Sequence, residues 1–188
     1  MVTEFKPITD ADWPESLAAL KGGFATGLNV YRTMAHHPDL LAAWAPLRAH
    51  VVTNPSLTPD QSEVVILRTG HRLGAAYEWA HHVHRGRKIG MDDARIASIA
   101  GPLAAMTAAD ATLARAVDDL FDTRRLSPAS QQALVDLVGA QGMFDLIATV
   151  GFYSVLGFIV ESCDTPIDTA VAAELKEKPL AMLSLIHI

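Results

Sequence analysis

The stretch Thr58–Gly90, TPDQSEVVILRTGHRLGAAYEWAHHVHRGRKIG, predicts two consecutive helices. A Thr-Pro pair with Gln61 at the third helical position is typical of a capped helix start. Apolar residues then recur at helical spacing, and we expect this first helix to end before Gly70. A second helix is predicted over about 74–88. Two adjacent helices of this length form the simplest unit of an all-α fold.

The remaining sequence has the same helical character. Ala and Leu dominate it, strictly alternating β-branched runs are scarce, and Pro and Gly divide it into segments of helix length. Further helices are predicted over 15–20, 28–33, from Pro38 onward, 94–100, 111–121, 129–138, 146–160 and 170–178. The sequence therefore predicts an all-α fold in a single domain, 1–188, with its core at about 40–102 and a second helix pair at about 111–163.

One helix start occurs twice. Residues 57–63 (LTPDQSE) line up with 126–132 (LSPASQQ), and in that register Gly70 falls on Gly139. This similarity favours a bundle of two helix-pair halves. The chemistry is not repeated, because the positions of Glu63, Glu78 and His82 are taken by Gln132, Ile147 and Gly151.

The composition excludes several classes of protein. Half of the 188 residues are hydrophobic and only 19% are charged, which is unlike a disordered chain. The formal charge is −6 and no basic tract is present, so we expect no nucleic-acid partner. The single cysteine, Cys163, excludes internal disulfides, cysteine-based zinc sites and CxxC oxidoreductases.

Residues 146–160 (LIATVGFYSVLGFIV) are the candidate membrane segment. Fifteen helical residues span about 22 Å, less than the ~30 Å hydrocarbon core, so we interpret the segment as a buried helix. The N-terminus has acids, prolines and no apolar run, which does not fit a secretory signal. We therefore expect a cytoplasmic protein with no membrane partner. The end of the chain, 183–188, follows no clear helix and is set aside.

Seven of the eight histidines lie between His36 and His84. On a helix, Glu78 and His82 share one face, and Glu63 joins them if the two central helices fold back on each other. A carboxylate beside an imidazole tunes its pKa and can make an acid/base pair that works near pH 7. The alternative is a simple surface pair with no catalytic role.

The other polar residues of this helix suggest packing or solvation. His81, His84 and Lys88 form an adjacent stripe that we interpret as a solvated or interface face. Glu63, Glu78 and His82 are three conceivable metal ligands, but no HExxH or similar pattern is present. We therefore expect neither a metal nor a cofactor.

The segments 62–68 (SEVVILR) and 77–82 (YEWAHH), followed by Gly90, resemble the carboxymuconolactone decarboxylase family, which includes the alkylhydroperoxidase D-like proteins. The resemblance covers about 40–102. It implies an all-α fold of helical hairpins and assembly into a homo-oligomer, a trimer or a hexamer.

In the peroxidase branch of that family, a CxxC and a later His lie on one helix, and a Glu lies on the helix before it. Glu63 and His82 match the Glu and the His, but Ala75 and Glu78 stand at the cysteine positions. A peroxidatic cycle needs a nucleophilic and a resolving thiol. Peroxiredoxin activity is thus implied by the family name only.

The decarboxylase branch lacks the thiol pair and has a Glu one turn before the His. Glu78 and His82 have this spacing. The resemblance implies loss of carbon dioxide from a small lactone acid and protonation of the resulting dienolate, without a cofactor. His82 is the expected proton donor, Glu78 its orienting partner and Glu63 a second acid/base group or a structural partner.

A substrate carboxylate calls for a guanidinium, which binds it bidentately. Arg68, Arg72 and Arg85 are the candidates, and Tyr77 is a further candidate for substrate binding. The leading hypothesis is a lyase or isomerase acting on a small organic acid or lactone. The alternative is a non-catalytic oligomeric binding protein on the same fold, and a thiol-dependent alkyl hydroperoxidase is the least favoured.

Overall fold

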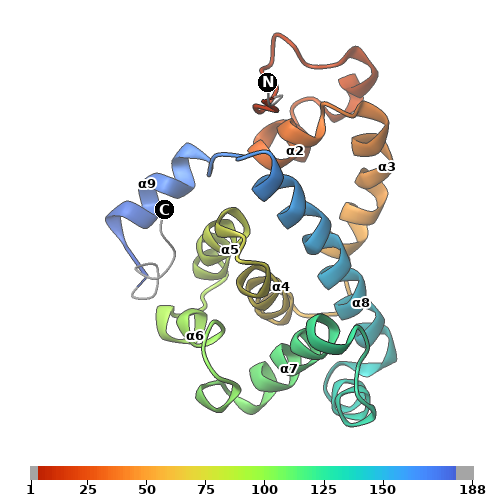
Figure 1. Cartoon of the computed structure of the whole chain (residues 1–188), viewed down its shortest axis with the longest axis vertical. Helices are drawn as coiled ribbons and strands as arrows, with labels where there is room; N and C mark the ends of the chain where they lie inside the picture. The colour runs from red at the N-terminus through yellow and green to blue at the C-terminus, as the bar shows by residue number, and fades with distance from the viewer. Residues whose placement is uncertain (1–3, 181–188) are drawn as a thin grey trace.

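A computed structural model describes residues 4–180, which form a helical bundle without a β-strand in that range (Figure 1). The all-α prediction is confirmed. The segment 183–188 lies outside the described residues. In chain order the elements are η1 (Glu15–Leu20), α1 (Phe24–Gly27), α2 (Asn29–Met34), α3 (Pro38–Arg48), the π-helical η2 (Ala49–Thr53), α4 (Pro59–Leu73), α5 (Ala76–Lys88), α6 (Asp93–Ser98), η3 (Leu103–Ala105), α7 (Ala108–Thr123), α8 (Pro128–Ser162) and α9 (Thr169–Glu177).

Helix α4 begins where the sequence predicts. The Thr58 hydroxyl accepts the N–H of Gln61, and the Gln61 side chain accepts the N–H of Thr58 at 3.0 Å, which completes a capping box. The predicted end before Gly70 is wrong by about one turn. The helix runs through Gly70 and ends at Gly74, whose φ of 66° is the left-handed conformation that glycine adopts freely.

Gly70 serves close packing of α4 on α5. A Cβ at this position would lie 3.4 Å from the Cβ of Glu78 and 3.4 Å from the backbone nitrogen of Trp79. Both distances are ordinary van der Waals contacts, so the backbone of α4 at Gly70 packs directly on α5.

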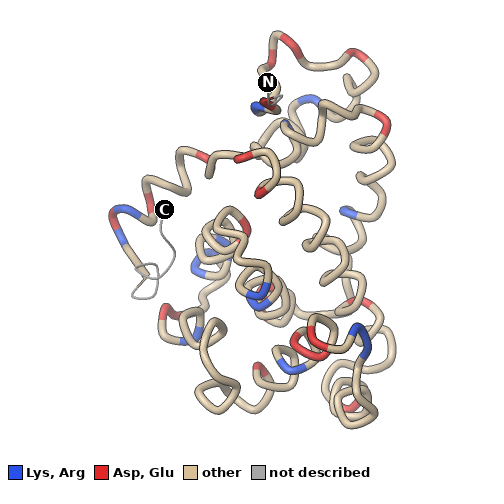
Figure 2. Tube along the Cα trace, in the orientation of Figure 1, with Lys and Arg blue, Asp and Glu red and all other residues tan. Residues whose placement is uncertain are grey.

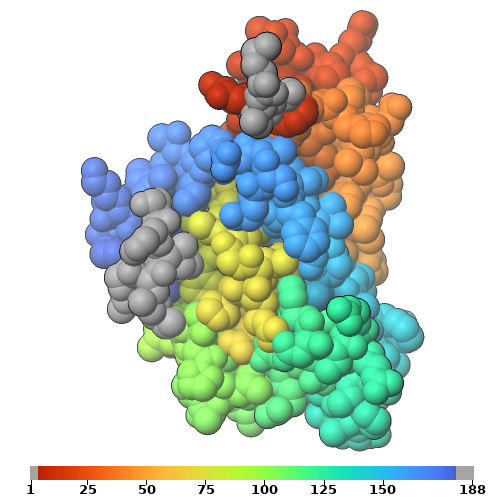
Figure 3. Space-filling view, viewed as in Figure 1, coloured from red at the N-terminus to blue at the C-terminus, as the bar shows by residue number. Residues whose placement is uncertain are grey.

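The α4–α5 hairpin contributes to two hydrophobic clusters. One cluster joins Leu67 and Trp79 to Leu113 of α7 and to the first part of α8. The other joins Tyr77 to the N-terminal helices and to Phe152 in the second part of α8. In Figure 3 the hairpin, drawn in yellow, is bordered by blue C-terminal and green central residues. The hairpin is therefore the central element of the fold.

Helix α8 consists of two helices joined at Gly139. Ser127 and Pro128 begin it in the same way that Thr58 and Pro59 begin α4. At Gly139 the backbone is non-helical (φ 73°, ψ 173°), and the two parts point in different directions (Figure 1). In the first helix pair, α4 and α5, the break that corresponds to Gly139 falls at Gly74. The two pairs therefore differ by about one turn in register.

Helix α8 is also the most apolar element. Among the described residues it is long and apolar enough to cross a membrane, and half of its most apolar window is buried inside the protein. It carries no Lys or Arg along its length (Figure 2). Asp145 within it accepts a hydrogen bond from the Ser56 N–H at 2.6 Å and contacts His50 Nε2 at 2.6 Å.

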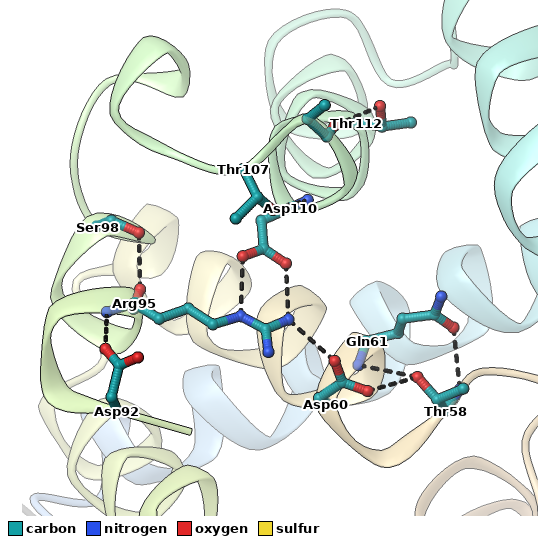
Figure 4. Close-up of polar contacts among 10 residues, drawn as sticks. Thr58, Asp60, Gln61, Asp92, Arg95, Ser98, Thr107, Asp110 and Thr112 are labelled. Carbon is teal, nitrogen blue, oxygen red and sulfur yellow. Dashed lines mark hydrogen bonds and ion pairs between the residues drawn. The ribbon is translucent and has the colours of Figure 1, made fainter. Parts of the chain in front are cut away.

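An ion-pair network links three helices at one end of the bundle (Figure 4). Arg95 of α6 donates to both carboxylate oxygens of Asp110 on α7, at 2.9 and 2.8 Å, and to Asp60 on α4 at 3.0 Å. Thr107 caps α7 by accepting the Asp110 N–H. Asp110 does not complete a reciprocal capping box, because its buried carboxylate is bound by Arg95.

We predict that Arg95→Met lowers the free energy of unfolding by about 2–3 kcal/mol, because it leaves the carboxylate of Asp110 buried without its partner. Asp110 is only 1% exposed. Chemical denaturation measures the change. Arg115→Met is the matched control, since Arg115 is exposed on α7. A loss no larger than that of the control would show that the network does not stabilise the fold.

Candidate active site

The α4–α5 hairpin places Glu63 against His82. The carboxylate oxygen Oε2 of Glu63 lies 2.6 Å from Nδ1 of His82, and the two residues are only 3% and 4% exposed. This contact confirms the geometric expectation that Glu63 joins His82 across two helices. It is a short, charge-assisted hydrogen bond in a site from which water is largely excluded.

Glu63 is held in its ionised form. Burial by itself raises the pKa of this carboxyl, but the attraction of His82 and Arg85 outweighs burial, so the net pKa lies below its ordinary value. Arg85 donates its Nε–H to the other carboxylate oxygen at 3.1 Å. An ionised carboxylate only accepts hydrogen bonds.

The state of Glu63 fixes the tautomer of His82. Because the carboxylate accepts, Nδ1 of His82 carries the hydrogen and donates it, which leaves Nε2 with a lone pair. Burial lowers the pKa of His82, and Glu63 offsets only part of that effect. At neutral pH His82 is therefore an oriented, uncharged imidazole with a basic Nε2. The ring of Tyr153 meets it edge-on, with 4.9 Å between ring centroids.

Glu78 is protonated at neutral pH, whereas Glu63 is ionised. Its Oε2 lies 3.8 Å from Nε2 of His82, too far for a hydrogen bond, and burial raises its pKa to about 8. Its Oε1 is buried and has no hydrogen-bond partner among residues 4–180. The expected role of Glu78 as the orienting partner thus falls to Glu63. Glu78 is instead a carboxylic acid that keeps its proton at pH 7.

Glu78 and His82 line a cavity of about 340 Å³. Its wall is formed by residues of several helices, namely Gly27, Leu28, Val30, Tyr31, Arg48, Val52, Tyr77, Glu78, His81, His82, His84, Arg85, Lys88, Tyr153, Leu156, Asp168, Ala170 and Val171. A second cavity of about 290 Å³ is lined by Glu63. Val52, Arg85 and Tyr153 line both cavities. The Glu63–His82 pair therefore has one member on each cavity wall.

Arg68 and Arg72 lie outside this site. Arg68 binds both carboxylate oxygens of Asp118 and the carbonyls of Ile99 and Gly101, and Arg72 pairs with Asp118 and Asp122. Arg68 follows Glu63 by five residues on α4, which places the two side chains about 140° apart around the helix axis. Arg68 therefore leaves α4 on a different face from Glu63. The expected substrate contact of Arg68 is not supported, and Arg85 remains as the sequence-predicted arginine at the cavity.

The Tyr77 hydroxyl has a structural role. It donates to Asp168 at 2.6 Å and accepts the N–H of Val30 at 3.2 Å. Both of its hydrogen-bonding functions are satisfied, so it forms cavity wall without offering a free group to a ligand, contrary to the expectation for it.

Helix α9 covers the histidine stripe of α5. Asp168, just before α9, contacts Nε2 of His81 at 2.8 Å, and Glu174 pairs with His84. His81 is only 6% exposed, so of the two alternatives predicted for this stripe, a solvated or an interface face, the solvated one is wrong for His81. Ala170 and Val171 of the same segment line the larger cavity.

The sequence did not point to Tyr31, Arg48 or Tyr153 as cavity residues. They come from α2, α3 and α8, and no local motif connects them to the central hairpin. Burial raises the pKa of the hydroxyls of Tyr31 and Tyr153, so both remain protonated at neutral pH. Within residues 4–180, no three His, Cys, Asp or Glu residues are arranged to hold a metal ion.

Comparison with family models identifies this part of the chain. Residues 38–118 match the model of the carboxymuconolactone decarboxylase family. The family resemblance drawn from the sequence is confirmed over these residues. Of the site residues, Arg48, Glu63, Glu78 and His82 lie within the carboxymuconolactone decarboxylase segment. Tyr31 and Tyr153 complete the cavity from outside it.

Two solved structures of the debrominase Bmp8 have the same fold as this protein. A cysteine-to-alanine variant in complex with 2,3,4-tribromopyrrole matches with a TM-score of 0.73 and 17% identity, and apo Bmp8 with a TM-score of 0.71 and 16% identity. Each match covers 94% of this chain and 98% of Bmp8. No curated protein sequence matches the chain.

We predict that Glu78 makes the protein less stable as the pH rises. Its pKa is about 8 in the folded state and about 4.3 in an unfolded chain. Between these values the folded state keeps a proton that the unfolded state releases, so the free energy of unfolding falls by about 1 kcal/mol per pH unit. The loss is complete above about pH 8.

Denaturation of the wild type and of Glu78→Gln from pH 5 to 8 measures this dependence. We expect the stability of the wild type to fall relative to that of the variant as pH increases. Glu161→Gln, at an exposed position of α8, should follow the wild type. Parallel curves for the wild type and Glu78→Gln would mean that Glu78 titrates normally.

Proposed function

We propose that the protein is a cofactor-independent enzyme that decarboxylates or isomerises a small organic acid or lactone. The observation that supports this proposal most directly is the pairing of an uncharged acid, Glu78, with an oriented base, His82, in one cavity. Two titratable groups whose environments give them different protonation states are typical of acid/base catalysis.

Each group has a defined part in the proposed chemistry. In a decarboxylation, the bond between carbon and the carboxylate breaks, carbon dioxide leaves, and the electron pair stays on the substrate as a dienolate. Glu78 then donates its proton to carbon and regains one from solvent, relayed by Nε2 of His82. In an isomerisation, Nε2 of His82 first removes a proton from carbon, and Glu78 returns one at another position. The imidazolium then passes its proton to the Glu78 carboxylate, directly or through solvent, which restores both groups. Groups of this kind each contribute about 10²–10⁴-fold to a rate.

Glu63 acts through His82 in this proposal. It holds the hydrogen on Nδ1, so that Nε2 is the basic atom, and its charge stabilises the imidazolium that forms when His82 takes a proton. Glu63 is thus a positioning residue. Arg85 keeps Glu63 ionised through its Nε–H bond.

Thiol chemistry does not enter the proposal. Cys163 ends α8 and lines neither the 340 Å³ nor the 290 Å³ cavity. A peroxidase cycle would need a second thiol to resolve the oxidised one. Debromination, which the name of Bmp8 states for that protein, is not transferred, because 17% identity supports the fold alone.

We predict that His82→Gln and Glu78→Gln each lower kcat by about 10²–10⁴-fold. A panel of lactone and enol acids, followed by carbon dioxide release and by NMR, provides the assay. The wild-type rate should fall as pH rises through about 8, where Glu78 loses its proton, and should also fall in acid, where His82 gains one.

His71→Gln is the matched control, since His71 is an exposed histidine on α4 that lines neither cavity. It should leave the rate unchanged. Wild-type rates in both His82→Gln and Glu78→Gln would refute the assignment. A folded wild type that binds ligands in the cavity but converts no member of the panel would favour the alternative, a non-catalytic binding protein.

We further propose that the protein forms a homo-oligomer through α8. The second part of this helix leaves an apolar stripe exposed, consisting of Phe144, Ile147, Val155 and Phe158. Phe144 and Phe158 are 66% and 60% exposed in the single chain. An exposed apolar stripe of this kind is typical of a protein–protein contact.

We predict that Phe158→Glu reduces the molecular mass measured by analytical ultracentrifugation, because it places a charge in the proposed contact. Leu40→Glu, a change at an exposed position of α3 away from the stripe, is the control. A monomeric wild type would contradict this proposal without affecting the acid/base assignment.

A further inference from the structure

Arg48 is the last residue of α3 and lines the same cavity as Glu78 and His82. Its guanidinium carbon lies 4.1 Å from the ring centroid of Phe24 and 5.6 Å from that of Tyr31. The guanidinium lies over both rings and makes cation–π contacts with them. Arg48 is therefore fixed in position by aromatic rings and not by carboxylates.

The hydrogen bonds of Arg48 distinguish it from the arginines around it. Arg68, Arg72, Arg87 and Arg95 all pair with carboxylates, and Arg85 binds Glu63. Within the described range Arg48 forms no ion pair with a carboxylate, and its Nε is buried without a hydrogen-bond partner. Its guanidinium interacts with the Tyr31 hydroxyl, which opposes the effect of burial on the pKa of that tyrosine. A buried N–H without a partner is costly, and an acceptor supplied by a ligand would remove that cost.

The charges on the cavity wall favour an anion. Arg48, Arg85 and Lys88 bring positive charge to the wall. Asp168 is bound by Tyr77 and His81, and Glu78 is uncharged at neutral pH because burial raises its pKa. The larger part of the remaining wall is apolar or aromatic, with the rings of Tyr31 and Tyr153 among its residues.

We infer that Arg48 binds the anionic group of the substrate, and that the substrate is a small carboxylate with a flat apolar body. The fork of a guanidinium matches a carboxylate bidentately. The aromatic and apolar wall accommodates the body, in the cavity that also holds the acid and the base. This inference deepens the function proposed above, since it concerns the same cavity.

Benzoate is the probe, because it is a flat apolar carboxylate, and benzamide is its uncharged equivalent. Isothermal titration calorimetry should show that the wild type binds benzoate and that Arg48→Gln weakens binding about tenfold or more, as expected for a charge-assisted pair. Arg48→Lys should bind with intermediate affinity. Arg115→Gln, which removes an equal charge from an exposed site, should bind as the wild type does, and benzamide should bind more weakly throughout.

The inference is overturned if the wild type does not bind benzoate, or if Arg48→Gln binds it as tightly as the wild type. If Arg48→Gln does not fold, as judged by circular dichroism, equal affinity of Arg48→Lys and the wild type overturns it instead. Glu78→Gln should still bind benzoate. Arg48-dependent binding without turnover of any acid would therefore refute the proposed catalysis and leave the inference about Arg48 standing.

Discussion

The hydrogen bond between Glu63 and His82 is the interaction on which the rest of the site depends. It joins two helices that pack on each other at Gly70, and both of its partners are buried. Without His82 and Arg85, Glu63 would be a buried charge with no compensation, which is one of the most destabilising arrangements in a protein. The same bond selects the tautomer of His82. One contact therefore contributes both to the stability of the fold and to the proposed chemistry.

Two buried glutamates within reach of one imidazole have opposite charge states for a physical reason. Glu63 has two cationic or hydrogen-donating neighbours, whereas nothing but burial acts on Glu78. Desolvation alone neutralises a carboxyl, and desolvation compensated by cations leaves it ionised. The site thereby obtains an acid and an oriented base from three ordinary side chains. Acid/base chemistry at neutral pH requires this separation of roles.

The sequence predicted the features that depend on nearby residues. The capped start of α4, the helix spacing of Glu78 and His82, and the meeting of Glu63 with His82 all follow from helical periodicity over a few turns. It did not predict Arg48, Tyr31 or Tyr153, which reach the cavity from helices far away in the chain. The sequence also suggested Arg68 as a substrate-binding residue. This prediction failed because Arg68, although close to Glu63 in sequence, leaves α4 on another face. The burial of His81 was not predicted because the segment that covers it, Asp168 and α9, begins 87 residues later in the chain.

The position of Asp168 has a consequence for the order in which the protein is made. This residue accepts hydrogen bonds from Tyr77 and from the Asn29 backbone, 139 residues earlier, and the next few residues close part of the cavity wall. A nascent chain on the ribosome therefore has no complete ligand chamber until nearly all of the described residues have been translated. Until then the histidine face of α5 stays uncovered, since Asp168 and α9 are the segment that packs on it.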